Sequence, residues 1–260
     1  MKDLIFHKLT LLFYYFFSKK IYHNKCRICK SEDIEKLNLF FFTFIKIYIC
    51  NDCKICFQNP ILKKSEISKF YSRFYRQKKS LKKQIELHDR GLRRGQYIFN
   101  FIDDNSKKQL SNLRILEIGS GYGGILSFFK KMNNQVESVE IDDQCNNFLT
   151  TKLNLLNHRT LDKIILQKLT FDIIILSHVI EHINDINGFF LNIKKIMHDS
   201  TILYIEVPTF HKNYKLNKRS IQIGHIWYFT EDNINLLLDK NNFKIIKKNN
   251  KIQLLCQKQN

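Results

Sequence analysis

The stretch RILEIGSGYGG at residues 114–124 constrains the fold of this chain more than any other. An apolar strand from Ile115 to Ile118 runs directly into three glycines in a G-x-G-x-G pattern, and the apolar segment ILSFF follows as a helix. Glycines are needed there because the chain turns sharply and a ligand must approach bare backbone at the N-terminus of a helix. The stretch therefore predicts a strand, loop and helix of an α/β sheet that binds a nucleoside.

A second predicted strand, QVESVEID at residues 135–142, ends in two acids. Glu140 lies 21 residues after Gly119, which suits an acid that binds ribose hydroxyls in a doubly wound sheet, and Asp142 is the alternative for that role. Glu117 stands at the end of the first strand, two residues before the first glycine. An acid there suits a cationic α-amino group rather than a pyrophosphate, and the glycine spacing also departs from the dinucleotide pattern G-x-G-x-x-G.

The pattern E-x-G-x-G-x-G with a later acid resembles the class I S-adenosylmethionine-dependent methyltransferases. FDIIILSHVIEHI is similar to the fourth strand of that family with its loop, ILYIEVP to the fifth strand, and FKIIKKNNKIQLLCQK to the terminal antiparallel pair. The resemblance implies a doubly wound, seven-stranded Rossmann-like sheet with helices on both faces. It implies that S-adenosylmethionine is bound by Glu117, Gly119, Gly121 and Gly123 at the methionine moiety, Glu140 at the ribose, and Ser177 and His178 near the sulfonium. Residues 197–200, MHDS, replace the family's Lys-Pro-Gly-Gly turn, so a turn of different shape is expected there.

Two C-x-x-C knuckles near the N-terminus predict a structural zinc site. Cys26 and Cys29 form the first, Cys50 and Cys53 form the second, and 20 residues separate the two knuckles. Each knuckle presents two thiolates to one tetrahedral zinc, and four thiolates leave no open position for catalysis. The intervening stretch LNLFFFTFIKIYI (37–49) is rich in aromatic and β-branched residues and predicts strands of a ribbon. Cys56 lies three residues after Cys53. We expect it to stand outside the zinc site, or to replace one of the four cysteines as a ligand.

The end of this ribbon, C-x-x-C-x-x-x-F-Q-N-P, is similar to the zinc-ribbon methyltransferases of sugar and surface-polysaccharide pathways. GHIWYFTEDN (224–233) is similar to the E-H-x-x-Y-F-S stretch of the sugar C-methyltransferases, in which the histidine belongs to the catalytic group. Gly224 stands where that family has Glu, and we do not expect that family's large C-terminal domain here, so O-methylation is supported at least as well as C-methylation. The predicted catalytic residues are His225, on a loop that also carries Trp227 and Tyr228 before a helix that starts near Thr230, and Glu181 and His182. Packing or hydrogen-bonding roles are the alternatives.

The stretch SHVIEHIND (177–185) contains H-x-x-E-H, the inverted zinc-protease spelling, which requires both histidines on one helical face. The continuous apolar run FDIIIL before it predicts a buried strand, so His178 lies at a strand end and the helical geometry is excluded. A divalent cation at these positions, as in some quinone-pathway methyltransferases, is a remote alternative because His178 replaces the first acid.

The chain of 260 residues has a formal net charge of +19, with a concentration of basic residues at 63–94. This charge keeps open an RNA methyltransferase whose zinc module binds RNA. No N/D-P-P-Y/F loop follows the fourth strand, which disfavours the amino-methylating enzymes of that class. A catalytically silent binding module is the third hypothesis, disfavoured by the intact glycine pattern. A sugar, nucleotide sugar or related small metabolite is therefore the expected acceptor.

The expected organisation is an apolar helix at 1–23, a zinc ribbon at 24–60, a helical connector at 61–110 that Gly91 and Gly95 interrupt, and the methyltransferase domain at 111–260. Residues 9–18 are apolar over about half the length of a membrane span. A packed helix is the main expectation for them, and a peripheral membrane contact is the alternative. Seven cysteines without an export signal predict a cytoplasmic protein.

Overall fold

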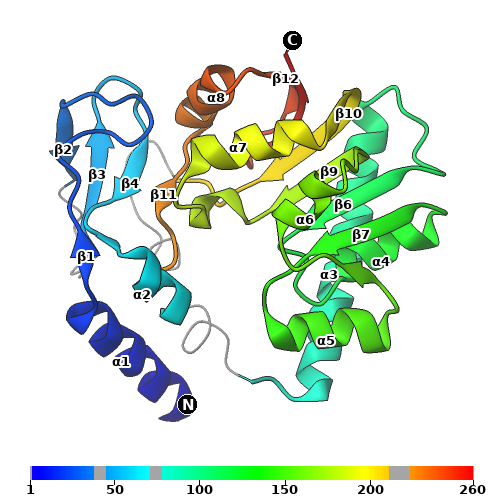
Figure 1. Ribbon diagram of the computed structural model, residues 1–260, viewed down its shortest axis with the longest axis horizontal. Helices are drawn as coiled ribbons and strands as arrows, with labels where there is room; N and C mark the ends of the chain where they lie inside the picture. The colour runs from blue at the N-terminus through cyan, green and yellow to red at the C-terminus, as the bar shows by residue number, and fades with distance from the viewer. Residues whose placement is uncertain (1, 38–44, 71–77, 211–222, 260) are drawn as a thin grey trace. The chain divides into compact units, whose positions relative to one another are not determined.

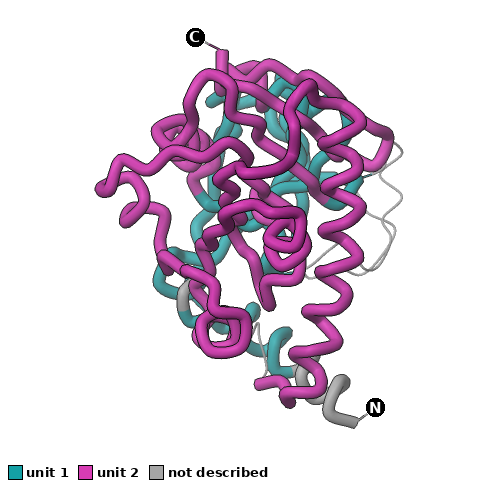
Figure 2. Tube along the Cα trace, turned by 90° about the vertical axis from the view of Figure 1, so that its right-hand side faces the viewer, with its two compact units in different colours: residues 1–77, 181–184, 208–237 teal, residues 78–180, 185–207, 238–260 magenta. Residues whose placement is uncertain are grey.

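The computed structural model describes residues 2–37, 45–70, 78–210 and 223–259. The chain forms two compact units, shown in Figure 2. Unit 1 comprises residues 1–77, 181–184 and 208–237, and unit 2 comprises residues 78–180, 185–207 and 238–260. Both units are assembled from segments that are distant in sequence, so this division differs from the linear boundaries expected at residues 60 and 110.

Unit 2 is built on a seven-stranded mixed sheet (Figure 1). In sheet order its strands are β8 (Leu156–Asn157), β7 (Gln135–Val139), β6 (Arg114–Ile118), β9 (Phe171–Ser177), β10 (Met197–Glu206), β13 (Gln253–Lys258) and β12 (Phe243–Lys248). The first five are parallel, while β13 is antiparallel to both of its neighbours. The strand order reverses between β6 and β9, and in open α/β sheets ligands bind outside the carboxyl ends of the strands at such a point.

Helices cover both faces of this sheet (Figure 1). One face carries α3 (Leu81–Asn105), α4 (Gly124–Lys131) and α5 (Asp143–Lys152), and the other carries α6 (Leu161–Leu166) and α7 (Ile186–Lys195). The central strand β9 is buried on both sides: Ile173 and Ile175 join the cluster that contains Ile98 of α3 and Phe129 of α4. This double burial explains why FDIIIL is a continuous apolar run rather than an alternating one.

Helix α3 is continuous through the two glycines that were expected to interrupt it. A Cβ on Gly91 would lie 2.8 Å from the Cα of Gly124, and a Cβ on Gly95 would lie 2.7 Å from the Cβ of Phe128. The glycines are therefore sites of close backbone approach, where α3 packs directly against α4. The expectation of an interruption was wrong because glycine in this helix serves helix packing instead of ending the helix.

Unit 1 begins with α1 (Lys2–Phe17), followed by β1 (Lys20–Ile21), which pairs antiparallel with β5 (Ile61–Leu62). A four-stranded antiparallel sheet has the order β11 (Trp227–Tyr228), β4 (Cys56–Gln58), β3 (Ile47–Cys50) and β2 (Ile34–Lys36). Residues 38–44 of the expected ribbon lie outside the described residues. Unit 1 also contains α2 (Lys64–Lys69), while the 3-10 turn η2 (Ile180–His182) and helix α8 (Glu231–Lys240) each have residues in both units.

Two local expectations differ from the structure. Trp227 and Tyr228, expected on a loop, form β11, because their backbone pairs with Phe57 and Cys56 of β4. The expected turn at residues 197–200 is instead the irregular start of β10, whose register on β9 shifts between Met197 and Ile202. In both cases a pairing partner far away in the sequence decides the local structure.

The close contact between α3 and α4 predicts that Gly124→Ala destabilises unit 2. The new Cβ would lie 2.6 Å from the Cα of Gly91, and also against the carbonyl oxygen of His88, so backbone must move. We expect a loss of at least about 3 kcal/mol in the free energy of unfolding, measured by urea denaturation. Ser127→Ala, in the same helix, is the control and should leave stability nearly unchanged. Equal stability of the two variants would contradict this packing.

Candidate functional site

The loop between β6 and α4 holds three glycines in the left-handed region of backbone space. Their φ angles are +74° at Gly119, +54° at Gly121 and +67° at Gly123, a region that residues with a Cβ rarely adopt. A Cβ on Gly123 would lie 2.5 Å from Leu149, whereas a Cβ on Gly121 meets no atom within 4 Å. The loop thus offers bare backbone to a ligand at Gly121, near the N-terminus of α4.

The carboxylate of Glu140, just beyond the end of β7, is held against this loop. Its Oε2 accepts a hydrogen bond from the Gly121 amide at 2.8 Å, and its Oε1 accepts one from the Asp142 amide at 2.9 Å. The side chain of Asp142 instead caps α5, where it accepts a hydrogen bond from the Cys145 amide at 2.8 Å. Glu140 is therefore the acid beside the glycine loop, and the alternative assignment to Asp142 loses support.

Glu117 is buried at the carboxyl end of β6, with only 2% of its surface exposed. Burial, followed by the charge of Glu140, raises its pKa from 4.5 to about 8, while the Arg94 guanidinium acts in the opposite direction. Within the described part of the chain, its Oε2 has no hydrogen-bond partner. Such an oxygen is costly to bury, so the position calls for a hydrogen-bond donor, best a cation, from a ligand.

Arg94 is a site residue that the sequence analysis treated only as part of a basic run. It projects from α3 and forms an ion pair with Glu206 at the end of β10, with 2.7 Å between Nη2 and Oε2. Glu206 also accepts hydrogen bonds from Tyr204, at 3.0 Å, and from Gln253, at 3.1 Å. The sequence carries no distinctive signal for Arg94, because its role depends on the packing of α3 next to the strand ends.

Ser177 and His178 lie where β9 ends. The Ser177 hydroxyl donates to Glu206 Oε2 at 3.4 Å, and the His178 amide donates to the Glu206 carbonyl oxygen at 2.8 Å. His178 has a φ of +56°. A positive φ is uncommon for a residue other than glycine, and it is incompatible with a right-handed α-helix at this position. This conformation agrees with the sequence-based exclusion of a helical H-x-x-E-H zinc site.

These observations fit the methionine end and ribose of S-adenosylmethionine. The orphaned Glu117 oxygen suits the α-ammonium, the bare backbone at Gly121 admits close approach, and the Glu140 carboxylate suits ribose hydroxyls. Arg94 lies close enough to influence Glu117, and its guanidinium suits the α-carboxylate. The residues that the sequence predicted to bind the cofactor therefore all lie in unit 2. They stand at the carboxyl ends of β6, β7 and β9, where the strand order of the sheet reverses.

Unit 1 brings the four knuckle cysteines together. The Sγ atoms are 3.6 Å apart for Cys26 and Cys53 and 3.4 Å apart for Cys29 and Cys50, and all four lie within 4.8 Å of one another. A tetrahedral zinc with bonds of about 2.3 Å has ligand–ligand edges of about 3.8 Å, so the four thiols fit such an ion. Cys56 lies in β4, where its thiol faces the Lys54 carbonyl oxygen at 3.9 Å.

A second cluster in unit 1 contains Glu181, His182 and His225. Their ligand atoms lie within 4.8 Å of one another, a spacing that would also suit a metal ion, and the two imidazole rings meet edge to face with centroids 4.8 Å apart. His182 Nδ1 lies 2.8 Å from the carbonyl oxygen of Gly224, and its Nε2 lies 4.0 Å from Glu181. Because a carbonyl can only accept, Nδ1 carries a proton, and in the neutral ring Nε2 has the lone pair.

Backbone and side-chain bonds fix this cluster. The Ile226 amide donates to the Glu181 carbonyl oxygen at 2.8 Å, and the Trp227 indole donates to the Ile183 carbonyl oxygen at 2.7 Å. Arg27 from the first cysteine knuckle stacks over Trp227, 5.0 Å from the ring centroid, and donates to the Asn184 side chain at 2.7 Å. The segment that carries His225 is therefore tied to the cysteine-bearing sheet within unit 1.

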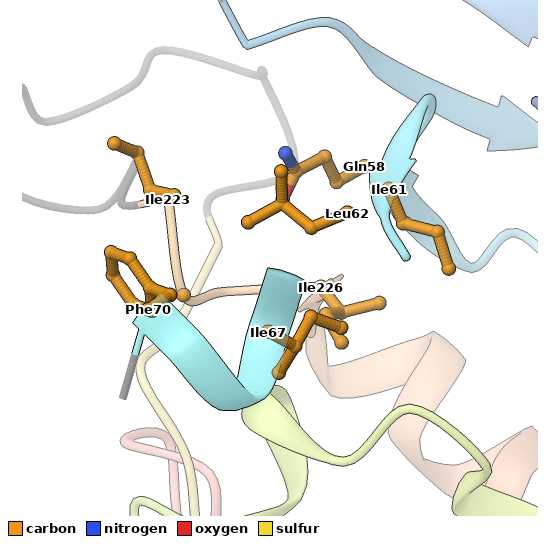
Figure 3. A pocket seen from close by; sticks show the side chains of 8 residues that line it. Gln58, Ile61, Leu62, Ile67, Phe70, Ile223 and Ile226 are labelled. Carbon is orange, nitrogen blue, oxygen red and sulfur yellow. The ribbon is translucent and has the colours of Figure 1, made fainter. Parts of the chain in front are cut away.

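Two small hollows adjoin the same segment of unit 1. One is lined by Glu181, Pro208, Thr209, Phe210, His225, Trp227 and Tyr228. The other is mainly apolar (Figure 3), and its lining comes from β4, β5, α2 with Phe70 just after it, and the segment at 223–226. The first combines a carboxylate and an imidazole with aromatic side chains.

The raised pKa of Glu117 predicts a pH-dependent stability of the ligand-free protein. Between pH 4.5 and about 8 the folded chain retains a proton that the unfolded chain has released, so stability falls as pH rises through this window. Glu117→Gln has no such proton, and its stability should fall less steeply, by a difference on the order of several kcal/mol across the window. Urea denaturation of both proteins from about pH 5 to about pH 8 tests this, and parallel curves would contradict it.

Comparison with known proteins assigns the fold. A sequence profile described as a methyltransferase domain matches residues 89–248. A ubiquinone biosynthesis O-methyltransferase of Rhodopseudomonas palustris is 32% identical over 113 residues, which are 41% of this chain. The match spans only 43% of that relative, so the likeness does not extend to the whole relative.

Solved structures show the same fold at low sequence identity. The 1,6-didemethyltoxoflavin-N1-methyltransferase of Burkholderia thailandensis, with bound S-adenosylhomocysteine, is 13% identical with a TM-score of 0.54, over 87% of this chain and 100% of that one. The magnesium protoporphyrin IX methyltransferase of Synechocystis, also with bound S-adenosylhomocysteine, is 11% identical with a TM-score of 0.54, over 75% and 100%. With the strand order and the glycine loop of unit 2, these matches show that the chain belongs to the methyltransferase domain family and is a class I S-adenosylmethionine-dependent methyltransferase.

Proposed function

We propose that this methyltransferase methylates a hydroxyl group on a sugar, a nucleotide sugar or a related small metabolite. The observation that carries the proposal is the cluster of Glu181, His182 and His225, of which Glu181 and His225 line a small hollow with aromatic side chains. A hydroxyl must lose its proton as it is methylated, and a histidine beside a carboxylate is suited to accept that proton. The O-methyltransferase activity named for the Rhodopseudomonas relative is in keeping with a hydroxyl acceptor.

Within unit 2 each polar group has a proposed role toward S-adenosylmethionine. Glu117 accepts from the α-ammonium, Arg94 binds the α-carboxylate, and Glu140 accepts from the ribose hydroxyls. Ser177 and His178 stand beside the sulfonium. When bound, the cofactor supplies an electrophilic methyl group, and alignment of that group with the acceptor provides much of the catalysis.

Within unit 1, we propose that His182 is the general base and that His225, which contacts it, binds the acceptor. The hydrogen bond to Gly224 keeps the proton on Nδ1, so that Nε2 is the atom that accepts a proton. The carboxylate of Glu181, 4.0 Å away, would stabilise the imidazolium that forms. Gly224 supplies a backbone carbonyl where the sugar C-methyltransferases have a glutamate, so that departure removes a carboxylate while a hydrogen-bond acceptor remains.

Methyl transfer, followed by mass spectrometry against nucleotide-sugar and glycan-precursor libraries, tests the acceptor. We expect a product heavier by one methylene unit and a kcat that falls at least about 100-fold in His182→Gln, with the dissociation constant for S-adenosylmethionine unchanged. His198→Gln, at a half-exposed histidine of unit 2, is the control. No product from these pools together with transfer to RNA would contradict the proposal and favour the nucleic-acid alternative, which the charge of +19 supports.

We also propose that the four-cysteine cluster holds a structural zinc, in keeping with a reducing cytoplasmic environment. Metal analysis after gentle dialysis should find about one zinc per chain, and Cys50→Ser should lose it because three thiolates bind zinc more weakly. Cys56→Ser is the matched control and should retain the metal, since Cys56 lies outside the cluster. Four titratable thiols without zinc in the untreated protein, or loss of zinc in Cys56→Ser, would contradict this assignment.

A further inference from the structure

The second half of helix α1 packs on the rest of unit 1 through Leu11, Tyr14 and Tyr15. Tyr15 is 3% exposed and joins the apolar cluster of Ile47 and Phe70, against which Leu11 and Tyr14 also pack. The Tyr14 hydroxyl donates to the Glu66 carbonyl oxygen at 2.6 Å, and the Tyr15 hydroxyl accepts from the Gln58 amide at 3.2 Å. These contacts orient the helix about its own axis within unit 1.

The same half of α1 also carries three phenylalanines whose side chains are more than half exposed. Phe13, Phe16 and Phe17 are 63%, 52% and 83% exposed, and their spacing of three and four residues places them on one side of the helix. The rings of Phe13 and Phe17 stack with centroids 6.2 Å apart. A contiguous aromatic surface of this kind, here termed the aromatic face (Phe13, Phe16 and Phe17), is characteristic of an interaction site.

Two lysines, Lys19 and Lys63, lie beyond the C-terminal end of α1. The pairing of β1 with β5 brings Lys63 beside Lys19, and the Lys63 amide donates to the Lys19 carbonyl oxygen at 3.0 Å. Both side chains are exposed. The neighbouring acid, Glu66, is largely covered and is bound by Tyr14 and Lys69. Aromatic side chains and positive charge therefore lie next to each other at this end of the helix.

We propose that the aromatic face docks on an anionic lipid surface, with the phenylalanines inserted between the acyl chains and Lys19 and Lys63 at the level of the phosphates. This arrangement is that of an interfacial helix, whose apolar face enters the bilayer while lysines remain among the headgroups. A charge of +19 attracts an anionic bilayer and repels a second copy of the chain. The proposal is independent of the acceptor and of the reaction mechanism.

The geometry favours a helix that lies in the membrane surface. At 1.5 Å per residue, the 16 residues of α1 extend about 24 Å, less than the roughly 30 Å of a hydrocarbon core. None of the helices in the described part of the chain has the length and apolar character needed to cross a bilayer. Leu11, Tyr14 and Tyr15 are already packed within unit 1, so among the described side chains of α1 the aromatic face is the one offered to lipid.

Vesicle co-sedimentation of the full chain tests the proposal. We expect binding to phosphatidylcholine vesicles that contain about 30 mol% phosphatidylglycerol and much weaker binding to pure phosphatidylcholine. The triple variant Phe13→Ser, Phe16→Ser, Phe17→Ser should lower the partition coefficient at least about tenfold. Circular dichroism and S-adenosylmethionine binding establish that each variant is folded.

Matched variants elsewhere on the surface distinguish docking through the aromatic face from non-specific hydrophobic adsorption and from the effect of net charge alone. Leu156→Ser, Leu166→Ser, Leu191→Ser removes three comparably exposed apolar side chains of unit 2 and should change partitioning less than about twofold. Lys19→Glu with Lys63→Glu should weaken binding to anionic vesicles about tenfold, more than Lys152→Glu with Lys244→Glu, which makes the same change in net charge.

Three outcomes would overturn the proposal: no sedimentation with anionic vesicles, equal partitioning of the phenylalanine and leucine triple variants, or equal effects of the two lysine pairs. Analytical ultracentrifugation and an RNA-binding assay cover the other occupants of the aromatic face. Self-association or RNA affinity that disappears in the phenylalanine variant, without any vesicle binding, would assign the surface to a second copy or to RNA.

Discussion

The candidate cofactor site of unit 2 centres on a carboxyl group buried where a β-sheet reverses its strand order. Glu117 is 2% exposed, its Oε2 has no hydrogen-bond partner among the described residues, and its pKa is raised to about 8. Such a group lowers stability unless a ligand completes its hydrogen bonds. The packing of α3 on α4 through Gly91 and Gly124 supplies the complementary charge, since it brings Arg94 to the same strand ends. A cofactor that carries an ammonium and a carboxylate on one carbon matches both groups.

The two units contribute different chemistry to the proposed enzyme. Unit 2 contains the glycine loop and the acids suited to the cofactor, while unit 1 contains the cysteine cluster and the histidine cluster. In unit 1, β11 pairs with β4, so the segment that carries His225 is part of the sheet that also carries Cys50. The four cysteines thereby support, within one folded unit, the segment proposed to serve the acceptor. Binding of zinc would then influence acceptor chemistry through folding, without any direct part in catalysis.

The sequence was sufficient where local pattern and chemistry coincide, and insufficient where distant segments decide the structure. Apolar runs predicted the strands at β6 and β9, and the resemblance carried by E-x-G-x-G-x-G implied the seven-stranded sheet and the class of enzyme. Strand, loop and helix are adjacent in the chain at that motif, whereas the short strand β8 was not predicted. Arg94 was not recognised, since its position depends on helix packing. Trp227 and Tyr228 were predicted as a loop because their strand partner lies about 170 residues earlier. Gly95 was predicted to interrupt α3, whereas it permits the close approach of α4.

Isothermal titration calorimetry with S-adenosylmethionine tests the central claim, that unit 2 binds this cofactor through Glu117 and the glycine loop. The account predicts saturable binding at one site per chain. It also predicts that Gly121→Arg abolishes this binding, because the new side chain fills the space that the loop leaves open. Gly188→Ala, at a glycine of α7 outside the site, serves as the comparison and should retain binding. Absence of saturable binding to the folded wild-type protein, or undiminished binding to folded Gly121→Arg, would contradict the account.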